Sequence, residues 1–274
     1  MPNLILVHQR SKQDPEDYRG IATRIAAQAP GIRVTVVDTK HEGAPPAPFA
    51  PDEPTLTVSP MPIKRFVPPR GALCQGFEHP KGDQYDALTR HGVAVPDWIR
   101  ITPDIALDPA AWGPYVVVKP ELGRKGAEIA IKRTGRVRWR DPLEYPEDHP
   151  VRKAPMLAQR FIYTGRWPSN YRVVTLFGAT LLCWRCEASH AYVPLNTRWD
   201  FKARGGISVV SNKKDSRYAL CDDADVIALA RRAHGAFPDQ PLLGTDIVRD
   251  ADTGTLYVIE CNPRGDAWLI SSDM

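Results

Sequence analysis

The sequence predicts an α/β (α+β) fold in which a small β-α-β unit precedes a larger, strand-rich region. Apolar runs at residues 4–7 and 33–38 flank a segment whose apolar side chains repeat with a helical period. From residue 115 onward, short strand-like runs are separated by Gly or Pro. With 274 residues, 43% of them apolar, the chain is long enough for about two domains.

The N-terminal segment is expected to form a small parallel sheet. The run "LILV" (4–7) predicts a strand, and "RVTVVD" (33–38) predicts a second one. Between them, residues 16–29 predict a helix that stops at Pro30-Gly31. Its apolar face consists of Tyr18, Ile21, Ala22, Ile25 and Ala29. This strand–helix–strand order is typical of a parallel sheet.

The next region joins this sheet to the rest of the chain. Residues 41–54 carry five prolines and predict an irregular loop, because proline fixes φ and lacks an N–H donor. The run "TLTVS" (55–59) predicts another strand. Residues 81–101 then predict a helix that ends at Gly92 and continues into an extended segment.

The remainder of the chain predicts many strands and one long helix. The helix covers residues 224–237 and has Asp222 or Asp223 as its N-cap. Two final strands, separated by the turn signal "ADTG", predict a closing hairpin. The other expected strands are 115–120, 127–133, 136–140, 156–162, 171–178 and 179–188.

Composition and charge narrow the class of protein. The net charge of +4 comes from 36 basic and 32 acidic residues, which fits an anionic small ligand better than nucleic acid. No apolar run reaches about 18 residues, so no membrane span is expected, and the apolar start is too short for a secretory signal. Five scattered cysteines favour a reducing, cytoplasmic location.

The closing hairpin carries the sharpest chemical signal. If its turn centres on Thr253, Asp246 lies directly opposite Glu260, and Asn262 shares their face. Two facing carboxylates repel each other, so a lysine, an arginine or a metal must lie between them. A set of oxygen donors suits Mg²⁺. A solvated strand end is the simpler alternative.

A second signal is the segment "VVVKPELGRKGAEIAI" (116–131). Lys119 ends an apolar strand, and Gly123 and Gly126 follow in a short basic loop. Glycine lets backbone N–H groups approach phosphate oxygens closely, and a lysine ammonium is a ready phosphate partner. The segment is not a Walker A loop, and a plain hairpin turn is the alternative.

Three arginines between these motifs could form a third signal. Arg172, Arg185 and Arg204 are either solvated strand-face residues or a bidentate clamp for phosphate oxygens. The CxxC spacing of "CWRC" (183–186) does not favour zinc, because residues three apart on a strand point to opposite faces. Cys261 should point away from its neighbours and into the core.

In this order, the motifs resemble the ATP-grasp superfamily. The matching stretches are "VVVKP" with its glycines, "MLAQRFI", "NYRVVTLFG", "ARGG", "GTDIV" and "VIECNPR", and the lysine-led helix from residue 81 also fits. The spacing is most similar to the branch of the ribosomal-protein glutamate ligase and its peptide- and amino-acid-ligating relatives. The resemblance covers about residues 80–265.

The resemblance implies an ATP-grasp fold, in which two α+β subdomains clasp ATP and a small β-α-β domain precedes them. The implied boundaries are residues 1–75, 76–155 and 156–274. Metal ligands would be Asp246, Glu260 and Asn262, holding one or two Mg²⁺. Arginines that orient the γ-phosphate or an acyl phosphate would be Arg172, Arg185, Arg204 and Arg264.

The resemblance also assigns the nucleotide contacts. Backbone groups of Arg160 and Phe161 would read adenine, although the first position is often Glu. Asn170 stands at a ribose- or phosphate-site position that is often acidic. The full set of ATP-contacting residues would be Lys81, Lys119, Gly123, Gly126, Gln159, Arg160, Phe161, Ile162 and Asn170.

The implied function is an ATP-dependent carboxylate–amine ligase that acts through an acyl-phosphate intermediate. Its substrates would be an amino acid, a peptide or another small carboxylate, together with an amine. A kinase on the same fold is the first alternative. The second, suggested by Arg160 and Asn170, is a nucleotide-binding module without turnover. Homo-oligomer formation is compatible with the sequence, whereas nucleic-acid and membrane partners are not expected.

Overall fold

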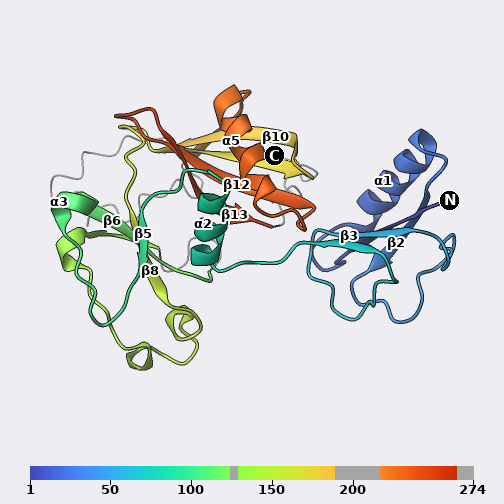
Figure 1. Ribbon diagram of the computed structural model, residues 1–274, viewed down its shortest axis with the longest axis horizontal. Helices are drawn as coiled ribbons and strands as arrows, with labels where there is room; N and C mark the ends of the chain where they lie inside the picture. Colours follow the sequence, from blue (N-terminus) through green and yellow to red (C-terminus); the bar gives the residue numbers. More distant parts are fainter. Residues whose placement is uncertain (124–128, 189–215, 264–274) are drawn as a thin grey trace.

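The computed structural model describes residues 1–123, 129–188 and 216–263. The described strands form three sheets, with the orders β2-β1-β3-β4, β5-β8-β6-β7 and β11-β10-β9-β12-β13. In Figure 1, the first sheet and its helix lie at one end of the molecule and an extended segment leads from them to the rest of the chain. The predicted mixed α/β architecture is confirmed.

The N-terminal sheet is parallel throughout. Its strands are β1 (Asn3–His8), β2 (Arg33–Asp38), β3 (Thr55–Ser59) and β4 (Ala72–Gln75), and β1 lies between β2 and β3. Helix α1 (Pro15–Gln28) connects β1 to β2, which confirms the predicted β-α-β unit. The sequence did not predict β4, because four residues without a clear alternation carry little signal.

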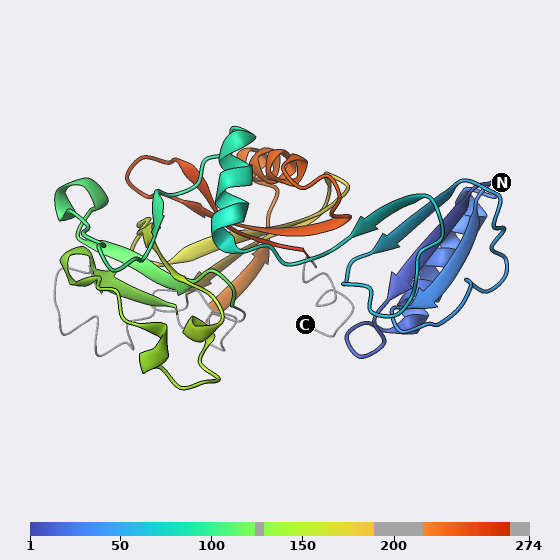
Figure 2. The ribbon, with the colours of Figure 1, turned by 60° about the horizontal axis from the view of Figure 1, so that its bottom comes forward.

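Helix α1 lies along one face of this sheet, as Figure 2 shows. Asp14 caps it by accepting a hydrogen bond from the Glu16 N–H, and Pro15 occupies its first position. In the described chain none of its side chains is fully buried, and Ile21 on the predicted apolar face is 46% exposed. The better-buried face of the sheet is the opposite one, where Phe66 packs on Ile5.

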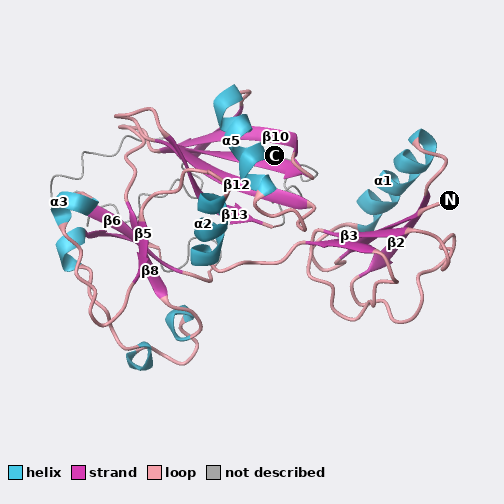
Figure 3. Cartoon of the chain, in the orientation of Figure 1, coloured by secondary structure: helices cyan, strands magenta, loops and turns pink. Residues whose placement is uncertain are grey.

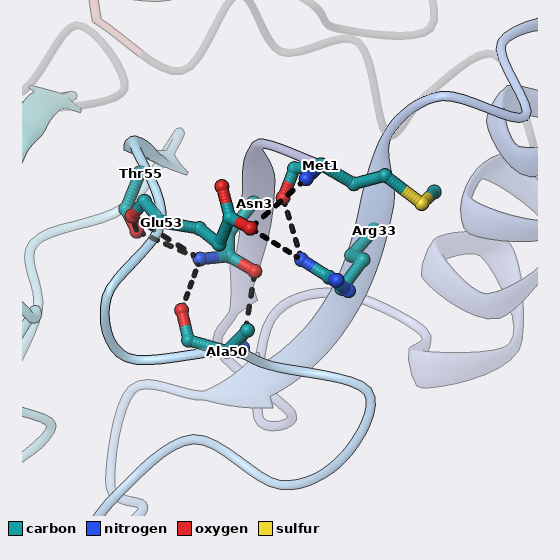
Figure 4. A network of polar contacts seen from close by, with 6 residues as sticks. All are labelled: Met1, Asn3, Arg33, Ala50, Glu53 and Thr55. Carbon is teal, nitrogen blue, oxygen red and sulfur yellow. Dashed lines mark hydrogen bonds and ion pairs between the residues drawn. The ribbon is translucent and has the colours of Figure 1, made fainter.

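The proline-rich loop is tied back to the first strand. The Asn3 amide donates to the Ala50 carbonyl at 2.7 Å and to Thr55 Oγ1 at 3.0 Å, and its oxygen accepts from the Ala50 N–H. Figure 4 shows this network together with the ion pair between the N-terminus and Glu53. Asn3 thereby replaces the regular backbone pairing that the prolines prevent.

The middle sheet is antiparallel. It contains β5 (Trp98–Arg100), β6 (Tyr115–Pro120), β7 (Ala130–Arg133) and β8 (Met156–Arg160). Strand β8 begins just after the predicted boundary at 155/156 and pairs with β5 and β6. The three-part division of the chain remains a proposal.

The predicted strand at residues 136–140 is wrong. The 3₁₀ helix η1 (Thr134–Arg136) ends at its first residue, and residues 137–140 pair with no described strand. The alternating pattern of "RVRWR" suggested a strand, but only Val137 is buried, whereas Trp139 is 38% exposed. A single anchoring side chain stabilises a loop without requiring a sheet partner. The other short helices lie in connections between strands: α3 (Pro109–Trp112) precedes β6, and η2 (Pro142–Glu144) and η3 (Pro150–Arg152) precede β8.

The C-terminal sheet positions most of the predicted site. Its strands are β9 (Ser169–Leu176), β10 (Ala179–Ala188), β11 (Ser216–Leu220), β12 (Leu242–Arg249) and β13 (Leu256–Asn262). All neighbouring strands in it are antiparallel, with β9 in the centre. Both strands of the predicted closing hairpin are therefore confirmed.

Two helices cover one face of this sheet. They are α2 (Lys81–Arg90) and α5 (Ala224–Gly235), which Figure 3 shows beside β12 and β13. Asp223 is the N-cap residue of α5, as one of the two predicted choices. Together with the sheet they form the largest apolar core, which includes Tyr85, Leu88, Tyr171, Val173, Leu229, Leu243, Ile247, Val258 and Cys261.

The closing hairpin contains a bulge that the sequence did not reveal. Near the turn, Ile247 pairs with Val258, but one step further Asp246 pairs with Glu260, so Ile259 is an extra residue. The predicted pair of Asp246 and Glu260 is confirmed, although the turn itself is not centred on Thr253. Because of the bulge, Val258 and Cys261 both reach the core although they are three residues apart.

Buried His234 on α5 makes the stability of this core sensitive to pH. Its Nε2 lies 2.9 Å from the Gln240 carbonyl and its Nδ1 lies 2.7 Å from Thr175 Oγ1. Burial lowers the pKa of His234 below its usual value of 6.5, although the contact with the Gln240 carbonyl raises it in part. The unfolded chain therefore binds this proton more readily than the folded chain does.

The His234 contribution to stability is therefore expected above about pH 6.5 and should be lost as the pH falls through the range below it. The measurement is urea unfolding at neutral and mildly acidic pH. A His234→Gln variant should be less stable at neutral pH but should show a smaller loss on acidification. The exposed residue His91, replaced by Gln, is the matched control. An unchanged pH dependence in His234→Gln would contradict the prediction.

Candidate functional site

The candidate site lies where three elements meet. The β12–β13 hairpin supplies Asp246, Glu260 and Asn262, the end of β6 supplies Lys119, and the first residue of α2 is Lys81. Both lysines are buried, at 4% and 5% exposure, which is unusual for a long cationic side chain. The chain therefore holds two cations in contact with the hairpin at the cost of removing them from water.

The carboxylates of the hairpin are paired with basic side chains. Arg172 on β9 donates two hydrogen bonds to Asp246, from Nε to Oδ1 and from Nη2 to Oδ2, the latter at 2.8 Å. Asn262 donates to the same carboxylate at 3.1 Å, and Lys81 lies 3.1 Å from Glu260. Of the three kinds of positive group expected between the carboxylates, the described residues supply an arginine and a lysine.

Lys119 is placed by the bulge in β13. Its ammonium donates to the carbonyl of the extra residue, Ile259, at 3.1 Å, and the Tyr85 hydroxyl donates to the same oxygen at 2.8 Å. Lys119 also lies 5.4 Å above the Tyr85 ring. A carbonyl released from the regular ladder thus becomes an anchor for two side chains of the site.

Lys119 has an unusual electrostatic environment. Its pKa is lowered to about 7: burial is the main cause and nearby Lys81 adds to it, whereas Glu260 and Asp246 oppose the shift. Its ammonium makes no direct ion pair within the described residues, so an incoming anion would stabilise its charged form. This arrangement suits a site that receives a negatively charged ligand.

The start of α2 is fixed by Glu121, a buried residue just beyond β6. The Glu121 carbonyl accepts from the Lys81 N–H at 3.0 Å, and its carboxylate accepts from Arg100 Nε at 2.6 Å. Gly82 lies against this ion pair: a Cβ there would lie 2.7 Å from Arg100 Nη2 and 2.8 Å from Glu121 Oε1. The close approach of the start of α2 to the end of β6 therefore requires a residue without a side chain at position 82.

Gly82→Ala is therefore expected to lower the free energy of unfolding by about 1–3 kcal/mol, because the new methyl group must displace the buried carboxylate of Glu121 and its partner Arg100. Denaturant unfolding measures this change. Gly20, on α1, is the matched control, since a Cβ there meets nothing within 4 Å. Gly20→Ala should instead stabilise the chain by up to about 1 kcal/mol. Equal effects at both positions would contradict the close packing at Gly82.

The structure does not bring the predicted arginines together. Arg172 pairs with Asp246 across β9 and β12, whereas Arg185 lies opposite Tyr171 on β9. Because neighbouring residues on a strand face opposite sides, Arg185 lies on the other face from Arg172. There it pairs with Glu187 at 2.6 Å. Arg204 and Arg264 lie outside the described residues, as does Gly126.

The expected adenine-binding segment follows β8. Gln159 is 2% exposed, and its amide nitrogen has no hydrogen-bond partner among the described residues. The Arg160 N–H donates to the Asp97 carbonyl at 2.7 Å, and its guanidinium lies 3.6 Å from the Asp97 carboxylate. Phe161 and Ile162 are half-buried beyond the strand end, and Gly123 is half-buried at the start of the glycine loop.

Asn170 lies on the same face of β9 as Arg172. Its side-chain oxygen is buried and has no hydrogen-bond partner within the described residues. A buried polar atom without a partner is costly, and a bound ligand can supply the missing hydrogen bond. The unpartnered atoms of Asn170 and Gln159 are therefore compatible with a polar ligand.

The hairpin offers oxygen donors of the kind that Mg²⁺ prefers, namely two carboxylates and one amide. Within the described ranges no group of three or more His, Cys, Asp and Glu side chains could hold a metal ion. Asp246, Glu260 and Asn262 fit Mg²⁺ in donor chemistry, with the remaining ligands coming from solvent or phosphate. To bind the ion, Asp246 would have to be shared with or released by Arg172, and Glu260 likewise by Lys81.

Sequence reasoning missed four residues that hold the site together, namely Gln84, Tyr85, Arg100 and Glu121. The Gln84 side chain accepts from the Cys261 N–H at 2.9 Å, which fixes the strand between the two β13 donors. Helical spacing could have indicated Gln84 and Tyr85, which lie three and four residues after Lys81 and thus near its face. The ion pair of Arg100 and Glu121 depends on the tertiary contact of α2 with the end of β6.

No protein-family model matches the chain, and comparison with curated proteins finds no match. Solved structures do match it. The D-cycloserine synthetase DcsG is 19% identical with a TM-score of 0.50, covering 95% of this chain and 91% of DcsG. The ATP-grasp ligase PsnB, in complex with minimal precursor, Mg and ADP, is 15% identical with a TM-score of 0.51 over 95% and 88% of the two chains.

A third similar structure is the macrocyclase MdnC from Microcystis aeruginosa MRC, bound with the precursor peptide MdnA. It is 11% identical with a TM-score of 0.50, covering 96% of this chain and 92% of MdnC. These likenesses show that the chain has the ATP-grasp fold, as the motifs predicted. In the part of the chain that the structure describes, no helix is both long and apolar enough to cross a membrane.

Proposed function

We propose that this protein is an ATP-dependent ligase that joins a carboxylate to an amine. The observation that carries the proposal is the convergence of buried Lys81 and Lys119 with Asp246, Glu260 and Asn262 at one point of an ATP-grasp fold. Two desolvated lysines beside two carboxylates suit a polyphosphate and its divalent cation. The related fold of PsnB, solved with Mg and ADP, supports this choice.

Each predicted site residue that the structure describes has a proposed role. Lys81 and Lys119 bind phosphate oxygens, and Gly123 begins the loop beside them. Gln159 to Ile162 border adenine, while Asn170 offers its unpartnered oxygen to a ligand hydroxyl or amine. Asp246, Glu260 and Asn262 hold one or two Mg²⁺, which would neutralise phosphate charge during transfer.

Arg172 is the described arginine best placed to stabilise a transferred phosphoryl group, because it already lies on Asp246. Arg204 and Arg264 remain proposed partners for it. Arg185, on the other face and paired with Glu187, is the weakest member of the predicted set. No protein nucleophile is required, because transfer would proceed from ATP to the substrate carboxylate and the amine would then attack the acyl phosphate.

The proposed substrates are amino acids or peptides, in keeping with the minimal precursor bound to PsnB and the precursor peptide bound to MdnC. The test is incubation of the full chain with ATP, Mg²⁺ and pooled amino acids and short peptides, followed by ADP measurement and mass spectrometry. A product with a new amide bond and Mg²⁺-dependent ADP release supports the proposal, and chelation of the metal should abolish both. Cytoplasmic location and homo-oligomer formation remain proposals.

Two other outcomes would replace this assignment. A stable phosphorylated product without an amide bond would indicate a kinase. Calorimetric ATP binding without ADP release, whatever acceptor is supplied, would indicate a nucleotide-binding module.

A further inference from the structure

Two of the five free cysteines are close enough to react with each other. The Sγ atoms of Cys183 and Cys221 lie 3.2 Å apart, and both residues carry free thiols. No other sulfur–sulfur contact of this kind occurs in the described parts of the chain, which contain all five cysteines. Cys183 pairs with Val173 on β9, so it faces the side of the sheet opposite Arg172 and Asp246 of the proposed active site.

Strand pairing explains why these two residues meet. The β10–β11 ladder pairs Trp184 with Leu220 and Arg185 with Ala219, so the next rung places Cys183 opposite Cys221. The Cys221 N–H indeed donates to the Cys183 carbonyl at 3.1 Å. Residues facing each other in a hydrogen-bonded antiparallel pair have Cα atoms about 5.5 Å apart. A disulfide spans about 4.4–6.8 Å between Cα atoms, so the backbone geometry permits one.

The two thiols differ in accessibility. Cys183 is only 5% exposed and belongs to the apolar core beneath α5, whereas Cys221 is half-buried at its edge. Burial, followed by the contact with Cys221, raises the pKa of Cys183 to about 12. A dissolved oxidant therefore reaches Cys221 first, and Cys183 reacts second.

The CxxC spacing of Cys183 and Cys186 is misleading here. Cys186 pairs with Asn170 on β9, so it faces the opposite side of the sheet from Cys183. It is also buried, and burial raises the pKa of its thiol. The partner of Cys183 comes from the neighbouring strand and not from its own.

We propose that Cys183 and Cys221 form a redox-responsive pair that closes to a disulfide when glutathione disulfide is in excess. The Cys221 thiolate attacks one sulfur of glutathione disulfide and expels a glutathione thiolate. Cys183 then loses its proton and attacks the Cys221 sulfur of the mixed disulfide, expelling the second glutathione. Two protein thiols are oxidised and one glutathione disulfide is reduced to two glutathione molecules.

The cross-link would tie the edge strand β11 and the start of α5 to β10. It closes the chain between residues 183 and 221, which restricts the unfolded state. The apparent melting temperature should rise by several degrees, on the order of 5 °C. Because Cys183 must lose its proton, closure should also be faster at alkaline than at neutral pH. Neither expectation depends on the proposed ligase activity.

The experiment is to incubate the full chain with glutathione disulfide, alkylate the remaining thiols, and digest with trypsin without reduction. Trypsin cuts after Arg185, so Cys183 and Cys186 fall on separate peptides. Mass spectrometry should find the Cys183 and Cys221 peptides joined with the loss of two hydrogens. The joined species and the thermal shift should both disappear on treatment with dithiothreitol.

Three variants sharpen the result. Cys183→Ser should stop at a mixed disulfide of Cys221 with glutathione, whereas Cys221→Ser should leave Cys183 reduced. Cys186→Ser, the matched control on the other face, should still form the cross-link. The proposal is overturned if all five thiols of the unmodified chain remain open to alkylation on unfolding after oxidation, or if Cys183 is joined to another cysteine.

Discussion

Glu260→Gln is expected to lower Mg²⁺-dependent ADP formation by about 10³-fold or more. The change keeps the shape of the side chain but removes the negative charge that pairs with Lys81 at 3.1 Å and faces Asp246 across the hairpin. Without that charge, the site loses both a proposed metal ligand and the partner that holds Lys81. Steady-state ADP release with saturating acceptor is the measurement.

Glu187→Gln is the matched control for this experiment. Glu187 also belongs to the C-terminal sheet and pairs with a basic residue, Arg185, but on the face opposite Arg172. Its side chain is 35% exposed, close to the 28% of Glu260. Glu187→Gln should retain nearly full activity. Equal losses of ADP release in both variants, or full activity in Glu260→Gln, would contradict the proposed site.

Asp246→Ala is expected to lower the free energy of unfolding by about 3–5 kcal/mol, because it leaves the guanidinium of Arg172 buried without its charge partner. The two side chains are only 15% and 9% exposed, so solvent cannot replace the lost contact. Denaturant unfolding without nucleotide measures this effect separately from activity. The double variant Arg172→Met with Asp246→Leu should recover much of the loss, since it buries no unpaired charge.

An exposed ion pair provides the comparison. Arg140, just before η2, and Glu144, at the end of η2, lie 2.7 Å apart, and both side chains are more than half exposed. Glu144→Ala should leave the free energy of unfolding nearly unchanged, because water screens an exposed ion pair. If Asp246→Ala were as mild as Glu144→Ala, the pair with Arg172 would not stabilise the folded chain.

Much of the fold could be predicted because local patterns and tertiary structure agree. The β-α-β unit, the start of α2 at Lys81 and the complete strand β10 all follow from period, proline and glycine signals. The predicted strand at 136–140 failed because an alternating pattern cannot supply a pairing partner. Strand β4 was missed because its place beside β3 comes from the sheet and not from its own residues.

The candidate site was only partly predictable, because several of its residues are positioned by contacts between distant segments. Residue type and spacing indicated Asp246, Glu260, Asn262 and Lys119, whereas the direction of Arg185 depends on the register between β9 and β10. Tyr85 and Glu121 act through contacts with distant segments, at the Ile259 and Lys81 backbone respectively. The spacing of residues along the sequence does not indicate such long-range contacts.

The sequence by itself determined the strand-rich α/β architecture and the placement of two carboxylates and an amide on one face of the closing hairpin. It did so because side chains two apart on a strand share a face and facing strands bring distant residues together. Only the tertiary structure decided that Arg172 and Lys81 neutralise those carboxylates, that Lys119 is buried, and that Cys183 meets Cys221. Burial and charge pairing depend on how separate elements pack, and the bulge at Ile259 sets that packing at the site.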